Sequence, residues 1–115
     1  MHDTNEEITM PFQKLDVYVA ARELAVGVQR AKVKDAELRD QMGRASKSCF
    51  LNLSEGFTGD SVAMRGKFFS CAGGSAAEVA AAVDLAEALG FVEVGPALEI
   101  RALAVRIKKM LRRLR

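Results

Sequence analysis

Five polar residues in two groups have the types and spacing that acid–base chemistry requires. They are Ser48, Asn52 and Glu55 in one segment, and Ser75 and Glu78 in a later one. At 100° per residue, the first three lie within about 60° of one another along the edge of a helical apolar stripe. Two carboxylates beside a hydroxyl and an amide could transfer protons if their pKa values were pushed apart. A hydrolase or nuclease using Glu55 and Glu78 is therefore one interpretation.

The same five residues also fit a structural network between two helices. A buried amide or hydroxyl without a partner costs roughly 1 to 3 kcal/mol, so a satisfied network would penalise slipped pairings of the helices. Asn52 could bond to Glu78, or Ser75 to Glu55, across the bundle. We favour this interpretation, and so expect no catalytic residues and a protein that is not an enzyme.

Metal and cofactor chemistry has little support in the sequence. Cys49 and Cys71 are isolated, with no C-x-x-C pair, and the single histidine is His2. We therefore expect no zinc site, no disulfide and no cofactor. Free thiols suit a cytoplasmic protein. The acidic N-terminus lacks a signal-peptide pattern. We expect that no apolar stretch reaches the roughly 18 residues needed to span a bilayer, and therefore expect neither export nor membrane insertion.

Basic residues gather at the C-terminal end of the chain. The net charge is only +2, but every charged residue after Glu99 is a cation. These cations are Arg101, Arg106, Lys108, Lys109, Arg112, Arg113 and Arg115. A cationic helix can neutralise phosphate groups and release counterions, so we predict that these residues bind RNA or another nucleic acid. The same charges could instead stabilise the helix dipole and keep the protein soluble.

Apolar periodicity predicts four helices. A first helix is expected over roughly residues 12 to 33, and a second after a possible N-cap at Asp35. The 56–61 stretch supplies the next break and cap, followed by a helix of about 28 residues with the heptad positions Phe68, Ala72, Ser75, Val79, Ala82, Ala86 and Leu89. Gly90 fits the position after that helix, and Pro96 the first position of the fourth.

Short connections favour antiparallel neighbours, so the predicted fold is all-α, an antiparallel up-and-down four-helix bundle. We expect a flexible segment over residues 1–11 and one bundle domain over residues 12–115. The fourth helix places Ile100, Leu103, Ile107, Met110 and Leu114 on its apolar face.

Three segments carry a resemblance to a known family. The stretch from Gln41 to Phe57, QMGRASKSCFLNLSEGF, resembles the pattern Q-x-x-R-A-x-x-S-I-P-A-N-I-A-E-G of the four-helix-bundle proteins encoded in 23S ribosomal RNA intervening sequences. KFFSCAGGSAAE, ending at Glu78, and FQKLDVY, starting at Phe12, resemble two further segments of that family. Phe50 stands where the family usually has proline and Cys49 where it has isoleucine, which favours an unkinked second helix.

The resemblance implies a bundle that assembles as a ring, commonly a pentamer. It also implies kinship with the accessory proteins of diversity-generating retroelement reverse transcriptases, and no established activity. Our first hypothesis is thus a homo-oligomeric, non-catalytic RNA-binding protein. The alternative is an interaction scaffold for a partner such as a reverse transcriptase, without affinity of its own for nucleic acid.

Overall fold

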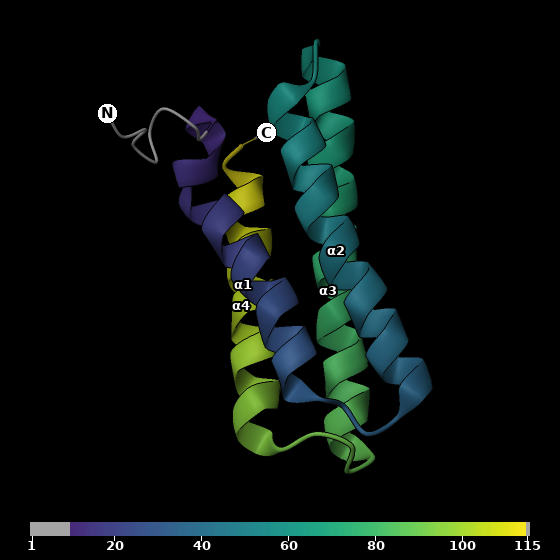
Figure 1. Ribbon diagram of the computed structural model, residues 1–115. Helices are drawn as coiled ribbons and strands as arrows, with labels where there is room; N and C mark the ends of the chain where they lie inside the picture. The colour runs from purple at the N-terminus through teal and green to yellow at the C-terminus, as the bar shows by residue number, and fades with distance from the viewer. Residues whose placement is uncertain (1–9, 115) are drawn as a thin grey trace, which may run out of the picture.

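The computed structural model describes residues 10–114, apart from the side chains of residues 13 and 14, and it contains four α-helices (Figure 1). They are α1 (Asp16–Ala31), α2 (Ala36–Thr58), α3 (Val62–Ala88) and α4 (Val94–Arg112), preceded by the short 3-10 helix η1 (Pro11–Lys14). Each helix packs against its neighbours in the cyclic order α1, α2, α3, α4. The predicted all-α four-helix bundle is confirmed, and no strand occurs between residues 10 and 114.

The α2–α3 hairpin extends past the ends of α1 and α4 at one end of the bundle (Figure 1). An aromatic cluster lies toward that end. Phe12 of η1 stacks on Phe57 with ring centroids 5.6 Å apart and meets Tyr18 edge-on at 5.7 Å. Tyr18 in turn contacts Phe50 at 4.8 Å, and Phe57 contacts Phe69 at 5.1 Å. The cluster therefore joins η1, α1, α2 and α3.

The predicted helix boundaries are largely correct. Asp35 Oδ2 accepts a hydrogen bond from the Leu38 amide at 3.0 Å, which confirms the N-cap of α2. The cap of α3 is Ser61, whose Oγ accepts from the Met64 amide at 3.1 Å. Gly90 has φ +79°, and the amides of Gly90 and Phe91 close a Schellman motif at the end of α3.

Two boundaries differ from the prediction. The helix predicted from residue 12 begins at Asp16, because residues 11–14 form the separate 3-10 turn. Pro96 is the third residue of α4, not the first, since the helix begins at Val94. The missing amide still costs nothing there, because first-turn amides have no acceptor within the helix. The predicted flexible segment falls mostly on residues 1–9, which include His2 and lie outside the described residues. Arg115 lies outside them as well.

The core positions of α3 are broader than the predicted heptad. Its buried residues are Phe69, Ala72, Gly73, Ala76, Val79, Ala82, Val83 and Ala86. Phe69 takes the buried position that we assigned to Phe68, and Leu89 is 56% exposed. The discrepancy arises because a straight helix drifts from a strict seven-residue repeat. On α4, Ala97, Ala104 and Leu111 are buried, while Leu114 is exposed.

α3 also bears on the membrane expectation. It is the one helix in the described part of the chain that is long and apolar enough to cross a bilayer, with a mean hydropathy of 1.2 over its best window. The expectation that no segment is long and apolar enough to span a membrane was wrong for α3. One such helix is weak evidence for a membrane span, because the core helix of a bundle meets the same test, and α3 packs between α2 and α4.

Candidate nucleic-acid interface and polar network

The C-terminal half of α4 separates an apolar face from a basic one. Ile107 and Leu111 are buried in the core. Four exposed cations occupy the opposite sector, and a fifth, the half-buried Lys108, lies at its edge beside α3; the five are Arg106, Lys108, Lys109, Arg112 and Arg113. At 100° per residue, all but Lys108 fall within about 120° of one another. None of the five has an ion-pair partner among residues 10–114. Their charges are therefore available to an external anion.

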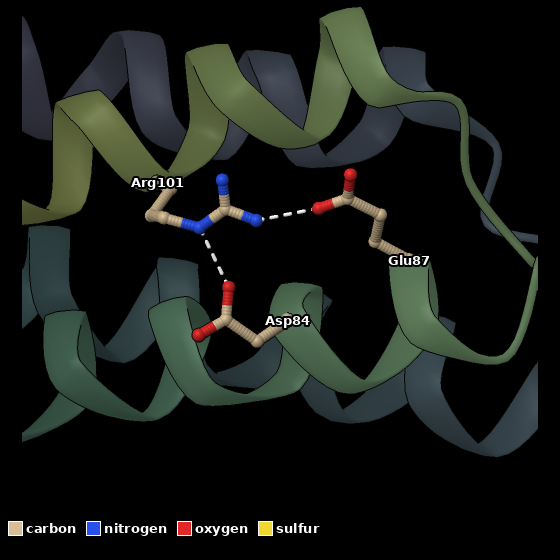
Figure 2. A network of polar contacts seen from close by, with 3 residues as sticks. All are labelled: Asp84, Glu87 and Arg101. Atoms are coloured by element: carbon tan, nitrogen blue, oxygen red, sulfur yellow. Dashed lines mark hydrogen bonds and ion pairs between the residues drawn. The ribbon is translucent and has the colours of Figure 1, made fainter.

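Arg101 differs from the other basic residues of α4 because it is already paired. Its Nε donates to Asp84 Oδ1 and its Nη2 to Glu87 Oε1, both at 2.6 Å (Figure 2). The hydrogen bonds that Arg101 donates to Asp84 and then to Glu87 raise the pKa of Arg101 above its ordinary value. The two carboxylates lie one turn apart on α3, so Arg101 links α4 to α3. The group carries a net charge of −1, which favours a bracing role over binding phosphate.

The polar network between α2 and α3 forms from three of the five predicted residues. The hydroxyls of Ser48 and Ser75 are 2.9 Å apart across the two helices. Asn52 Nδ2 donates to the Ser48 carbonyl at 2.9 Å and to the Ser48 hydroxyl at 3.0 Å. All three side chains are half-buried. The network thus fixes the register of α2 against α3 through a hydroxyl pair instead of the predicted bonds to Glu55 or Glu78.

The two carboxylates of the predicted catalytic pair lie apart from this network. Glu55 and Glu78 are exposed, and neither side chain bonds to another described residue. The pairings Asn52 with Glu78 and Ser75 with Glu55 are therefore not formed. Between residues 10 and 114, no group of three or more His, Cys, Asp or Glu side chains could hold a metal ion.

The two cysteines occupy contrasting environments. Cys49 is fully buried in the core, and this burial raises the pKa of its thiol from 9.0 to about 11. Cys71 is exposed on α3. Neither forms a disulfide. A thiol with its pKa raised by burial is a poor nucleophile near neutral pH, so Cys49 acts as a packing residue.

Close packing at the hairpin end depends on Gly56. A Cβ at this position would lie 2.5 Å from Phe69 Cδ1, which no real side chain tolerates. The aromatic ring therefore rests directly on the α2 backbone. Sequence reasoning missed this contact and the aromatic cluster, although the spacing of the phenylalanines gave a signal. α2 runs unbroken through Phe50, as the replacement of proline favours.

One comparison with known proteins gives a match. The family model described as 23S rRNA-intervening sequence protein matches residues 13–113, nearly the whole chain. The match spans all four helices. None of the curated proteins matches the chain significantly.

Proposed function

The chain belongs to the family of 23S rRNA-intervening sequence proteins, and from that premise we propose that it is a non-catalytic, homo-oligomeric protein that binds RNA phosphates through the C-terminal half of α4. One observation carries the proposal. Arg106, Lys108, Lys109, Arg112 and Arg113 form a basic sector without ion-pair partners among the described residues. Arg115, which we also predict as a contact, lies outside the described residues, and Arg101 braces α3 instead.

The contacts should go to the nucleic-acid backbone and not to the bases. Single-strand binders stack bases on exposed aromatic rings. Here the rings of Phe12, Tyr18, Phe50, Phe57 and Phe69 pack on one another at the hairpin end. None of these residues lies on α4. Binding should therefore be weakly dependent on sequence and strongly dependent on salt.

The test is fluorescence anisotropy with a labelled RNA hairpin and a DNA duplex of equal length. Neutralising about four phosphates predicts a loss of affinity of roughly 50- to 150-fold between about 50 and 200 mM salt. Changing Lys109, Arg112 and Arg113 to Gln should weaken binding by more than about tenfold and flatten the salt dependence.

A matched control removes the same charge elsewhere. Arg30, Lys32 and Lys34 are exposed at and just beyond the end of α1, at the other end of the bundle. Their replacement by Gln should change affinity far less. Equal losses of RNA affinity in the two triple variants would contradict a specific basic site on α4. An RNA affinity that does not change with salt concentration would contradict it too.

A second candidate function rests on exposed apolar side chains of α4. Leu98 is 59% exposed and Val105 is 45% exposed on its outer side. Such side chains favour a role as an oligomeric interaction scaffold. The partner implied by the family resemblance is the reverse transcriptase of a diversity-generating retroelement. A partner retained after nuclease treatment, by a protein with no RNA affinity of its own, would favour this candidate over the first.

The proposal of a non-catalytic protein is supported by the positions of Glu55 and Glu78. Both are exposed and lie outside the serine–asparagine network, so the two carboxylates are not assembled with a hydroxyl and an amide into one site. Glu78→Gln should leave RNA intact and RNA affinity unchanged. RNA cleavage that Glu78→Gln abolishes in a folded protein would restore the hydrolase interpretation.

A further inference from the structure

A shallow groove runs along the outside of the molecule between α1 and α2. It consists of two depressions that share Ala25, Val26 and Lys47 and so form one surface. Arg22, Phe50 and Leu51 line one end of the groove, and Arg39 and Gly43 line the other. The stretch of α2 from Arg39 to Leu51 is about 18 Å long at 1.5 Å per residue. The groove therefore has the length of about three helical turns.

The floor and one wall of this groove are apolar and open to solvent. Leu51 is 61% exposed and Val26 is 39% exposed. Half-buried Phe50 and Ala25 lie between them. Single exposed apolar residues are ordinary on protein surfaces, but two that line one depression together with Phe50 suit a surface that another chain covers.

The charges on the groove are of one sign. Arg22 stands on α1, and Lys47 and Arg39 stand on α2. No carboxylate lines either depression in the described chain, and Glu23 lines the neighbouring depression between α1 and α4 instead. Arg39 Nη1 donates to the Val33 carbonyl at 2.9 Å, which holds the guanidinium in place without neutralising it. An occupant with acidic flanks would complement these charges.

Gly43 lines the groove and leaves room for a close external approach. It lies inside α2, where glycine is unfavourable relative to alanine. Its φ is not positive, and a Cβ there would meet no atom within 4 Å. The fold of this chain thus does not require glycine at position 43. A glycine on a groove floor does let the backbone of a second helix come near.

We propose that the α1–α2 groove is a docking site for an acidic amphipathic helix of a partner protein. Its apolar face would lie on Val26, Phe50 and Leu51, and its carboxylates would face Arg22 and Lys47. Nucleic acid is a poorer fit because an apolar floor gives phosphates no compensation for lost water. None of the α4 cations takes part, so this inference goes beyond the proposed function and does not depend on it.

The probe is a labelled synthetic helix of about 15 residues, near the length at which isolated helices become stable. It carries leucines on one face and glutamates on the flanks, and a second peptide has lysines in place of the glutamates. The full-length protein should bind the acidic peptide saturably with a micromolar Kd, and the basic peptide about tenfold more weakly or worse. The double variant Arg22→Glu, Lys47→Glu should reverse that preference.

Substitutions at two glycines distinguish an effect on peptide docking from an effect on protein stability. Gly43→Leu fills the groove and should abolish peptide binding while the melting temperature holds or rises, since leucine favours helix. Gly74→Leu is the control, because Gly74 also lies inside a helix, on α3, with nothing within 4 Å of an added Cβ. It should bind the peptide like the wild type. RNA affinity should be unaffected in both variants, so a failure here is distinct from a failure of the α4 proposal.

The inference is overturned if the acidic peptide does not bind saturably or if the basic peptide binds equally well. It is also overturned if Gly43→Leu leaves peptide binding unaffected or lowers RNA affinity. A fall in the molecular mass of the assembly caused by Gly43→Leu, with Gly74→Leu unchanged, would also overturn it by assigning the groove to a second copy of the chain.

Discussion

Gly56 shows how one residue can set the distance between two helices. The ring of Phe69 occupies the space where a side chain at position 56 would lie. Gly56→Ala should therefore force the ring or the α3 backbone to move, at a cost of about 1 to 3 kcal/mol. Chemical denaturation measures this as a lower midpoint with an unchanged slope.

Gly66→Ala is the control for that measurement. Like Gly56, Gly66 lies inside a helix, in this case α3, but a Cβ at position 66 would meet nothing within 4 Å. It should stabilise the protein by about 0.5 to 1 kcal/mol, the usual gain of alanine over glycine in a helix. If both alanine variants are stabilised, the contact between Gly56 and Phe69 does not limit the packing.

The different exposure of the two thiols predicts how fast each one reacts with a labelling reagent. At pH 8, Cys71 should react with a thiol reagent at once, whereas Cys49 should react only on unfolding, because it is buried and its pKa is about 11. The folded state holds this proton more tightly than the unfolded state, so the contribution of Cys49 to stability falls as the pH rises from 9.0 toward about 11. Cys49→Ala should remove that part of the alkaline loss. Rapid native labelling of both cysteines would contradict the buried position.

At the scale of elements, the end of α1 carries a conformational cost. Lys32 caps α1 with φ 47° and ψ 54°, the left-handed region that favours glycine. Lys32→Gly should remove a conformational cost of about 1 to 2 kcal/mol and lose about 0.5 to 1 kcal/mol to the flexibility of glycine, for a net gain of about 0.5 to 1 kcal/mol. Lys32→Ala, which keeps the Cβ in the same conformation, should give no such gain. Thermal melts of the two variants decide this, and an equal rise in both would assign the effect to lost charge.

The helices themselves could be predicted because their signals are local. Asp35 and Gly90 mark boundaries through their own side chain or its absence, and apolar spacing identifies each stretch between them. The buried positions of α3 were harder to place, because its alanines and glycines give almost no contrast between faces. A run of small residues supports several registers, and tertiary contacts such as Phe69 on Gly56 select one.

The contacts between elements were mostly invisible in the sequence. Asp84 and Glu87 are one turn apart, yet nothing local shows that Arg101 of α4 reaches both. The predicted network had five members, but only Ser48, Asn52 and Ser75 bond to one another, and the two predicted carboxylate partners do not take part. The reason is that rotation of α2 about its axis decides which polar residues meet, and side chains far apart in the sequence set that rotation.

At the scale of the whole molecule, the exposed side of α4 predicts self-association. Leu98 and Val105 remain largely in water in the single chain. If the proposed ring is a pentamer, five chains of 12.5 kDa give 62.5 kDa. Sedimentation of the wild type should show a species well above one chain. The variant Leu98→Glu, Val105→Glu should sediment as a single chain with its helix content retained, and an unchanged mass would place any interface elsewhere.

The aromatic cluster has a consequence for how the chain is built during synthesis. Phe12 leaves the ribosome well before its stacking partner Phe57, and Phe69 follows later still. The 3-10 helix η1 can therefore pack fully only after the end of α2 has been made. A pause in synthesis before Phe57 would leave a nascent chain in which Phe12 has Tyr18 beside it but still lacks its stacking partner.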